Sequence, residues 1–578
     1  MSSKEIVTLQ IGHYSNFVGT HLWNIQDASF HYGPSVDSSS REINNDILFR
    51  EGQNLMGHIT YTPRLVAFDL RGCLNTLKQE GKLYEVTHEE EDIKWSGDVT
   101  MHKSVAPPKN RFLRDLDEQE AVQSQETIGN KIDSIEDVEL KDSELMAVDE
   151  NQSEAVFGST TYYNLDDTIT VWSDFIRLYL HPKSIYLMDK YTHGNEMEKF
   201  DIFGCGQQLM SDYATRTGVE DHLHYFVEDC DQLQGFQILL DTYDGFGGFG
   251  TQILQSLEDD YSSKGLLTMG VTPALLPDTT AYNRADRIIN SALSYVSCAG
   301  SSSLFVPLSM AQELWKKMGP PRVFDHLQYN PTHYHTSAIL AAALDNMTMP
   351  FRTTESPLHI WDITKTFSSL GRKLACLQLC LPFPLETDGN LVDSILNEGG
   401  QSSWRPLLPH MENKSSPLMQ SVALRGIPKT QIKQVTLASK SKETPQFLSS
   451  CSNVDEVLQN YLTGFFPNCF NAGCVMSDGC KVGSPFPHIF SKNITKDGLL
   501  SRMNRHEYQG VESVPMLTSL QSTPDVTQML RHLHKEASQL NIKKHHRFLE
   551  AGLEEDDYTE TLSSLLALCK QYDHQSDL

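Results

Sequence analysis

The chain has 578 residues and a formal net charge of −28, because 75 acidic residues outnumber 47 basic ones. Its length allows roughly two to four domains with a large core, and its charge argues against a nucleic-acid binder, which needs a basic face to bind phosphates. Hydrophobic residues make up 39% of the chain, a low share that indicates sizeable polar insertions but not disorder throughout.

Strand and helix patterns alternate along the first 345 residues. Strands are expected at residues 6–11, 64–69 and 266–270, and in the residues that lead into a glycine-rich turn at 243–248. Helices are expected at residues 17–23, 70–79, 171–180, 221–229, 252–261, 282–295 and 337–344. This alternation is typical of a parallel sheet with helices on both faces, so we predict an α/β fold.

The composition changes between about residues 115 and 159. Acidic residues, Ser, Gln and Asn dominate there, and aromatic residues nearly vanish. Such a segment buries too little apolar area to offset the entropy of ordering it. We therefore interpret residues 115–159 as a disordered acidic insertion, with an acidic docking site as the alternative.

A second region begins near residue 346. Residues 374–381 and 422–426 have strand patterns. Thr523 and Pro524 have the pattern of a helix N-cap and first position. A last helix is expected at 558–572, with Leu562, Leu565, Leu566 and Cys569 buried. The predicted organisation is a domain over residues 1–114 and 160–345 that holds the insertion, an intermediate α+β domain over 346–520, and C-terminal helices over 521–578.

The glycine-rich turn Tyr243-Asp-Gly-Phe-Gly-Gly248 is the most informative motif, because it joins a strand to a helix. Glycines in such a turn let backbone N–H groups face an anion at the positive end of a helix. Asp244 and Phe246 interrupt that chemistry: a carboxylate ~4 Å from a phosphate costs about 4 kcal/mol per charge pair at an effective dielectric near 20. Asp244 escapes this cost if it points away or meets Mg²⁺. Alternatively, the glycines only allow a helix and a strand to pack closely.

The chain shows no targeting or membrane pattern. Its 11 cysteines are scattered, and its first residues lack both a secretory apolar core and an Arg-rich presequence pattern. No apolar run reaches the ~18–20 residues that span a bilayer. We therefore expect a reduced, cytosol-facing protein.

Four stretches resemble tubulin, in chain order. Residues 5–19 resemble its opening strand and first nucleotide loop, 61–70 its third-strand segment, 230–248 its signature loop, and 554–560 with the helix after them its outer C-terminal helices. Gaps remain at the acidic insertion and across about 387–520. The resemblance implies a tubulin/FtsZ-like fold: a parallel-sheet nucleotide-type domain, an α+β intermediate domain and a C-terminal helical hairpin.

Within that superfamily the chain resembles the Misato family most closely. The resemblance lies in residues 9–24, 171–175, 233–236 with the Asp-Gly-Phe-Gly-Gly turn, and 382–385. It implies a role in mitochondrial distribution, morphology and fusion, and a cytosolic protein peripherally associated with the mitochondrial outer membrane. Expected partners are proteins at that membrane, with tubulin or a chaperonin as further candidates, and no nucleic acid.

The resemblance also implies where a vestigial site for GTP or GDP would lie. The matching positions are Gly12, His13, Asn16, Asp69, Asp244, Gly245, Gly247, Gly248, Asn283 and Asn330. Gly12, Asn16 and Asp69 match the tubulin pattern, whereas His13 stands where tubulin has a glutamine. Asn283 and Asn330 correspond to the asparagines that read the guanine ring.

Several positions depart from the tubulin pattern. Tyr243 and Asp244 replace leading glycines, and Phe246 replaces a threonine. Arg71 stands where tubulin has an acid near the metal, although an arginine is itself able to hold a phosphate. Lys365 stands where a neighbouring tubulin subunit presents the acid that positions the attacking water, and a lysine is no base at neutral pH unless strongly desolvated. We therefore expect no tubulin-like GTPase activity and at most weak nucleotide binding.

Two other functions remain open from the sequence. One is a GTP-binding switch or polymerising GTPase of the tubulin superfamily, which the nucleotide content of the purified protein would separate from a non-enzymatic regulator. The other is a cytosolic factor that handles tubulin or microtubules. Co-purification of tubulin or a chaperonin without mitochondrial recruitment would favour that second alternative.

Three weaker patterns complete the sequence evidence. The histidines of Thr332-His-Tyr-His-Thr336 are expected to cap or pack, not to bind a metal. Cys469, Cys474 and Cys480 fit no common zinc spacing, so no metal is predicted there. The basic cluster at 543–547 is expected to be a solvated helix face, with contact to anionic lipid as the alternative.

Overall fold

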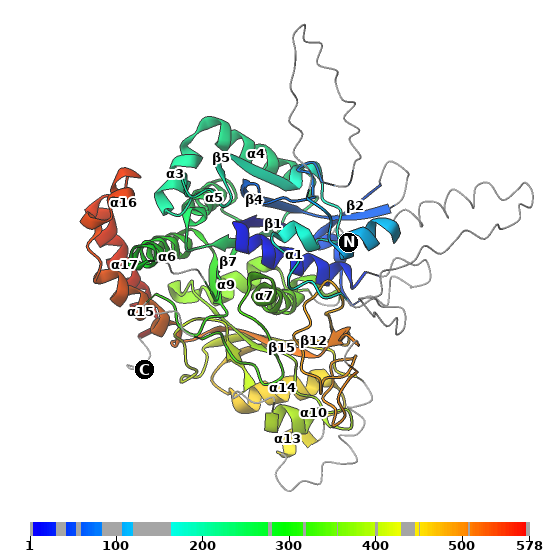
Figure 1. Cartoon of the computed structure of the whole chain (residues 1–578). Helices are drawn as coiled ribbons and strands as arrows, with labels where there is room; N and C mark the ends of the chain where they lie inside the picture. The colour runs from blue at the N-terminus through cyan, green and yellow to red at the C-terminus, as the bar shows by residue number, and fades with distance from the viewer. Residues whose placement is uncertain are drawn as a thin grey trace, which may run out of the picture.

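The computed structural model describes residues 4–30, 42–53, 59–81, 83, 107–119, 163–275, 280–315, 320–354, 357–398, 403–428, 445–449, 451–506 and 509–573. One sheet and its helices form the upper half of the view in Figure 1, a second sheet lies below it, and the C-terminal helices run along one side. Most of the predicted acidic insertion lies outside the described residues. Its first residues continue a helix over 111–119.

The first sheet has six parallel strands in the order β5-β4-β1-β6-β7-β8. These are β1 (Ile6–Ile11), β4 (Leu65–Arg71), β5 (Ile185–Thr192), β6 (Gly235–Asp241), β7 (Gly265–Thr272) and β8 (Leu304–Ser309), and a hairpin of β2 (Phe49–Gln53) and β3 (Ile59–Pro63) precedes β4. The chain moves outward from β1 on one side and then continues on the other. The carboxyl end of β1 is therefore a topological switch point, where open α/β sheets bind ligands.

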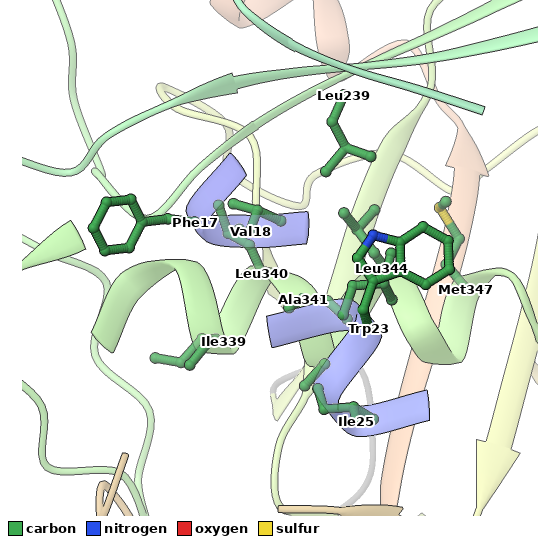
Figure 2. Packing of buried hydrophobic residues seen from close by; sticks show 14 of the residues in the cluster. Phe17, Val18, Trp23, Ile25, Leu239, Ile339, Leu340, Ala341, Leu344 and Met347 are labelled. Carbon is green, nitrogen blue, oxygen red and sulfur yellow. The ribbon is translucent and has the colours of Figure 1, made fainter. Parts of the chain in front are cut away.

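Helices cover both faces of this sheet, because alternate side chains of each strand point to opposite faces. On one face, α1 (His13–Asp27) packs against α7 (His333–Met347), and Figure 2 shows Val18 and Trp23 between Leu239 of β6 and side chains of α7. The other face carries α3 (Phe203–Ser211), α4 (Tyr213–Glu228), α5 (Gly245–Asp260) and α6 (Ala281–Ser301). The predicted α/β fold is confirmed.

The second sheet has five strands in the order β10-β9-β15-β11-β12, with β11 and β12 parallel and the other pairs antiparallel. They are β9 (Cys376–Cys380), β10 (Arg405–Pro406), β11 (Met419–Arg425), β12 (Phe470–Met476) and β15 (Met516–Ser522). The other elements of this region are α8 (Met349–Arg352), α10 (Leu391–Asp393), α13 (Gln446–Ser449), α14 (Val454–Phe465), β13 (Cys480–Lys481) and β14 (Ser513–Val514), whereas α9 (Ile360–Phe367) packs against β7 and β8 of the first sheet.

A buried ion triad joins α7 to the second sheet. Asp345 lies near the end of α7, and its two carboxylate oxygens contact Arg352 at 2.8 Å and Arg425 of β11 at 2.6 Å. The next residue, Asn346, donates to the carbonyl of Ala423 at 2.9 Å. All three charged side chains are almost fully buried, so the two sheets meet in one continuous interior. The domain boundary expected after residue 345 falls inside α7.

The C-terminal helices α15 (Val526–Ser538), α16 (His546–Glu550) and α17 (Glu555–Asp573) pack against α6 and share the apolar interior of its face (Figure 1). Leu565 and Cys569 are buried as expected, but Leu566 is 40% exposed. The first of these helices begins at Val526 with Asp525 as its N-cap, two residues later than predicted from Thr523 and Pro524. None of the helices in the described ranges has the length and hydrophobicity to span a bilayer.

Two predicted helices are wrong. Residues 70–79 form turns after β4, where Gly72 adopts a φ of +85°. Residues 171–180 contain only a short 3₁₀ turn, Trp172–Phe175, before the chain extends. Asn24 of α1 explains the second error: its side chain donates to the carbonyl of Phe175 at 2.8 Å and accepts from the N–H of Arg177 at 3.0 Å. These bonds use backbone groups that a helix would need for its own ladder.

Candidate nucleotide-type site

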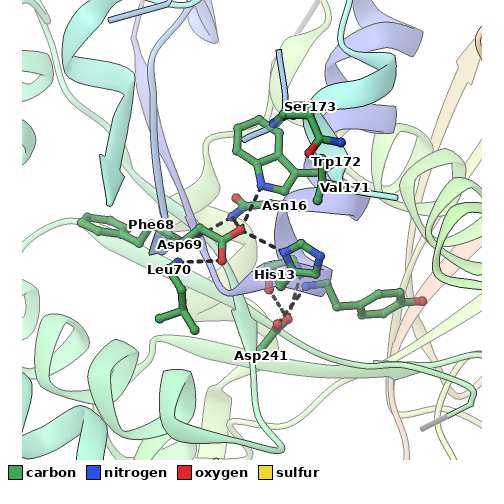
Figure 3. A network of polar contacts seen from close by, with 12 residues as sticks. His13, Asn16, Phe68, Asp69, Leu70, Val171, Trp172, Ser173 and Asp241 are labelled. Carbon is green, nitrogen blue, oxygen red and sulfur yellow. Dashed lines mark hydrogen bonds and ion pairs between the residues drawn. The ribbon is translucent and has the colours of Figure 1, made fainter. Parts of the chain in front are cut away.

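The candidate site lies at the carboxyl edge of the first sheet, beside the switch point. The start of α1 after β1 meets the carboxyl ends of β4 and β6 there, so the structure brings together His13, Asn16, Asp69 and Asp241 (Figure 3). A parallel sheet makes this meeting inevitable, because the carboxyl ends of all its strands lie at the same edge.

Asp69 is the centre of a buried polar network. One carboxylate oxygen accepts from the Trp172 indole at 2.9 Å and from Asn16 at 3.1 Å, and lies 3.2 Å from Nδ1 of His13. The other accepts from the N–H of Leu70 at 2.8 Å. Figure 3 shows these donors converging on the carboxylate from three separate segments. The hydrogen bonds to its carboxylate therefore connect Asp69 to the start of α1 and to the segment that contains Trp172.

The titration of His13 and Asp69 follows from this contact. Burial alone lowers the pKa of His13, but the Asp69 carboxylate outweighs it and the pKa is raised. Burial raises the pKa of Asp69, yet His13 and the other donors more than offset it, so that pKa is lowered. Both shifts describe an imidazolium–carboxylate pair that favours its charged form.

Asp241 occupies the N-terminus of α1. It is the last residue of β6 and fully buried, and its carboxylate accepts from the N–H of Tyr14 at 2.9 Å, the N–H of Ser15 at 2.8 Å and the Ser15 hydroxyl at 2.7 Å. These first-turn N–H groups are the ones with which a helix N-terminus binds an anion. Burial raises the pKa of Asp241 to about 7, against the lowering effect of the bonds from Ser15 and Tyr14.

Gly12 shows how closely the carboxylate fits. Its φ of +118° belongs to the region that favours glycine, and a Cβ added there would lie 2.4 Å from the Asp241 carboxyl carbon. The side chain of Asp241 thus fills the space beside the turn from β1 into α1.

Asp244 caps the second helix of the site, α5. Its side chain accepts from the N–H of Phe246 at 2.9 Å and its carbonyl from the N–H of Gly247 at 3.2 Å, while the N–H of Gly245 donates to Phe200 at 3.1 Å. The first N–H groups of α5 are therefore bonded within the chain. Burial, and next the carboxylate of Asp241, raise the pKa of Asp244 well above its usual range.

The glycines of the turn face other helices. A Cβ on Gly248 would lie 1.8 Å from the carbonyl oxygen of Phe203 in α3, and one on Gly247 would lie 2.2 Å from the Ser294 hydroxyl of α6. On Gly245 it would meet the Phe200 ring at 3.0 Å. These contacts agree with the alternative that the glycines only allow close packing of neighbouring segments. The neighbouring segments, however, are two helices and a loop, whereas a strand was expected. Their part in nucleotide binding stays a prediction.

Phe246 lies in the apolar interior. It is 3% exposed, and its ring meets that of Phe200 edge to face at 5.0 Å between centroids. The ring therefore contributes to the core beneath α5. Tyr243 instead directs its hydroxyl toward Asp241 at 3.4 Å.

Two further histidines gather beside His13. His193 stacks on it with ring centroids 4.1 Å apart, and His333, the first residue of α7, packs against the rings of Tyr14 and Phe17. Burial lowers the pKa of His333 to about 4, assisted by His13 and His193. Arg71, a candidate phosphate ligand, forms an exposed ion pair with Asp189.

The remaining predicted positions are spread over the molecule. Asn283 lies in the first turn of α6, where its side chain accepts from the Thr280 hydroxyl at 3.0 Å. Asn330 is exposed before α7, and its backbone N–H donates to His335. Lys365 lies on α9, at the opposite edge of the sheet, because Ile360 at the start of that helix contacts the amino ends of β6 and β7. There Lys365 lies over the Trp361 ring at 5.5 Å.

The weaker motifs also have defined places. His335 contacts Asp166 at 2.8 Å, and Thr332 caps α7, as a capping role predicts. In the basic cluster, Lys543 pairs with Glu555 at 2.9 Å, and Arg547 pairs with Asp201. No group of three or more His, Cys, Asp or Glu suited to a metal occurs in the described ranges.

Sequence reasoning missed Asp241, Trp172 and His193 as site residues, and it did not place His333 at the site. A signal existed for Asp241, since an acid that ends a wholly apolar strand lands at the carboxyl edge of the sheet. Trp172 lies in a motif that was recognised but interpreted as helix. His333 lies in the Thr332–Thr336 motif, whose histidines were expected to cap or pack, and its packing against Tyr14 and Phe17 agrees with that. Nothing local marks His193, because the contact that places it joins distant segments.

The strand order, the two helices at the switch point and the central α7 between two sheets define a tubulin-like protein. In agreement, a family model described as a tubulin domain matches residues 163–353, and one described as the Misato Segment II tubulin-like domain matches residues 4–118.

The chain belongs to the Misato family. It is 36% identical over 583 residues to "Protein misato homolog 1" of Danio rerio, covering 99% of this chain and 97% of that protein. It is 35% identical to the Homo sapiens protein of the same name, covering 99% and 98% of the two chains. "Protein misato" of Drosophila melanogaster is 29% identical, covering 98% and 97%.

Proposed function

We propose that this Misato-family protein is a non-enzymatic, tubulin-like scaffold whose nucleotide-type site is filled by its own side chains. The observation that carries this proposal is the pair of aspartates on the two helix N-termini: Asp241 accepts from first-turn N–H groups of α1 and Asp244 from that of α5. A nucleotide phosphate would need these same donors.

Electrostatics supports the same proposal. Asp69, Asp241 and Asp244 place three carboxyl groups at one sheet edge. Because burial raises the pKa of Asp244 well above its usual range, that group occupies the α5 N-terminus in its neutral form. An ionised carboxylate, such as Asp69 or Asp241 above its pKa of about 7, costs about 4 kcal/mol when it lies ~4 Å from a phosphate at an effective dielectric near 20, nearly three orders of magnitude in affinity. Lys365, at the position of the water-positioning acid, supports the absence of polymer-coupled hydrolysis.

The experiment is to denature the purified full-length protein and measure released guanine nucleotide by anion-exchange chromatography. We expect no stoichiometric GTP or GDP, and no saturable binding in a titration to millimolar GTP. Stoichiometric nucleotide that turns over with time would refute the scaffold proposal and favour a GTP-dependent switch.

We also propose a cellular role, with family membership as its support: regulation of mitochondrial distribution, morphology and fusion, through protein partners at the cytosolic face of the outer membrane. Cells depleted of the endogenous protein would be supplied with wild-type or Lys365→Glu protein, and matrix mixing between mitochondria would be measured. The substitution puts an acid at the position of tubulin's water-positioning acid; because a scaffold does not depend on hydrolysis, both proteins should restore mixing equally. Failure of the wild type to change mixing, together with co-purified tubulin or chaperonin, would favour a tubulin-handling factor.

A further inference from the structure

Among the residues that the structure describes, no strand pairs with the outer side of β12, so one side of the second sheet is open there. This strand is the last in the order β10-β9-β15-β11-β12. The N–H of Phe470 bonds to Leu418, and the carbonyl of Met476 bonds to Gly426, both toward β11. Because alternate residues of a strand point the same way, the intervening odd-numbered residues direct their N–H and C=O groups outward: Asn471, Gly473 and Val475.

This edge lacks the usual protection against pairing. The sequence Phe-Asn-Ala-Gly-Cys-Val-Met of β12 contains no charged residue and no proline. Natural edge strands are commonly blocked by such residues, by bulges or by being very short. The opposite edge strand, β10, is only 2 residues long. An open, uncharged edge of this kind is suited to the addition of a further strand.

The neighbours of β12 limit where a strand could add. The N–H of Ser477, directly after β12, is bonded to the Glu42 carboxylate at 2.9 Å. On one face, the Asn471 side chain donates to the carbonyl of Leu462 in α14 at 3.3 Å. On the other, Phe470 leaves 62% of its surface exposed. The open edge therefore runs from Asn471 to Val475, about 17 Å for five residues.

Two exposed carboxylates lie near this edge. Glu42 bonds to Ser477 directly after β12, and Asp455 acts electrostatically on Cys474 of β12. A third exposed acid, Asp478, follows the strand by two residues. Burial raises the pKa of Cys474 in β12 to about 11, and the carboxylates of Asp455 and Glu42 act in the same direction, so their field reaches the strand. The arginines that oppose them, Arg352 and Arg425, are buried and bound to Asp345.

We propose that β12 is a docking edge for an extended segment of a partner protein that has an uncharged, β-forming centre flanked by Lys or Arg. Backbone pairing with Asn471, Gly473 and Val475 supplies the register, and the exposed Phe470 ring supplies an apolar contact. The carboxylates near the edge and the chain's net charge of −28 select the basic flanks. The same charge disfavours a second copy of this chain as the occupant.

The test uses the full-length protein and a synthetic peptide, acetyl-Lys-Lys-Thr-Val-Thr-Val-Thr-Lys-Lys-amide, with a matched peptide in which Glu replaces every Lys. Binding is measured by fluorescence anisotropy, and hydrogen exchange is followed by mass spectrometry over residues 470–476. The variant Val475→Pro removes one outward N–H without breaking a bond to β11. Val475→Thr is the matched control, because it keeps both the N–H and the branched shape.

We expect the lysine peptide to slow exchange across β12 in the wild type and in Val475→Thr, and to bind Val475→Pro about tenfold more weakly. If Val475→Pro does not fold, Asp455→Asn should still weaken the lysine peptide while leaving β12 exchange unchanged without peptide. Equal binding of the glutamate peptide, or no protection by either, would overturn the proposal. Slow exchange of the outward N–H groups of β12 in the free protein would also overturn the proposal. If it did not change with protein concentration, the chain itself would cover the edge; if it increased with concentration, a second copy would cover it.

Discussion

Replacing Asp241 with alanine should destabilise the protein and expose an anion site. The change leaves the buried N–H groups of Tyr14 and Ser15 without their acceptor. Each unsatisfied buried donor costs about 1–3 kcal/mol, whereas relief of repulsion with the neighbouring carboxyl group of Asp244 returns part of this. We therefore expect the free energy of unfolding to fall by about 2–4 kcal/mol, and by about 1 kcal/mol for Asp241→Asn, which keeps an acceptor oxygen.

The assay is urea unfolding followed by tryptophan fluorescence, with and without inorganic phosphate at constant ionic strength. Phosphate at ten times its Kd should raise the unfolding free energy of Asp241→Ala by about 1.4 kcal/mol, because the phosphate oxygens can accept from the N–H groups that Asp241 no longer occupies. The wild type and Asp241→Asn should gain much less. An alanine variant as stable as the wild type, or an equal phosphate effect on all three proteins, would refute the idea that Asp241 takes the place of an anion.

Three further predictions concern packing, the ion triad and pH. Gly248→Ala should lower the melting temperature, because the new Cβ would lie 1.8 Å from a backbone oxygen. The control Gly300→Ala in α6 has nothing within 4 Å of the new Cβ and should stabilise the protein by about 0.5–1 kcal/mol. Similar melting temperatures for the two variants would contradict the glycine-packing argument. Arg425→Met should cost about 3–5 kcal/mol in urea unfolding, because it leaves Asp345 with a single buried partner, and a loss below 1 kcal/mol would contradict this. Burial lowers the pKa of His21 to about 3 from an unfolded value near 6.5. The unfolding free energy is therefore unaffected by protonation of this histidine above pH 6.5 and falls by about 1.4 kcal/mol per pH unit as the pH drops toward 3. His21→Gln should reduce the slope of unfolding free energy against pH between 6.5 and 5 by about 1.4 kcal/mol per pH unit, and an unchanged slope would contradict this.

The elements that could be predicted from the sequence are those with a strong local pattern. The strands β1, β4 and β7 and the helices α5, α6 and α17 follow apolar periodicity, because burial alone decides their state. The helix predicted at residues 171–180 is wrong because distant contacts, not the local pattern, decide the conformation there. Its backbone groups bond to Asn24 across 151 and 153 positions of sequence, and no local pattern records such contacts.

Part of the candidate site could also be predicted from the sequence. The meeting of His13, Asn16 and Asp69 follows from the carboxyl ends of two parallel strands, β1 and β4, lying side by side, and the structure brings these residues together. The sequence also pointed to a negative charge in the glycine turn, at Asp244. It did not show that Asp241 enters the neighbouring helix N-terminus, because that contact depends on β6 lying directly beside β1.

The central helix α7 gives the molecule a mechanical property. One end carries His333 beside the capped loops, and the other carries Asp345 in the clamp of two arginines. At 1.5 Å per residue, its 15 residues form a rod about 22 Å long. In a protein that exchanges ligands at one end, such a rod can push on what lies at the other. In the scaffold that we propose, side chains occupy the place of the ligand, so this rod would receive no push at the His333 end and would hold the two sheets in a fixed arrangement.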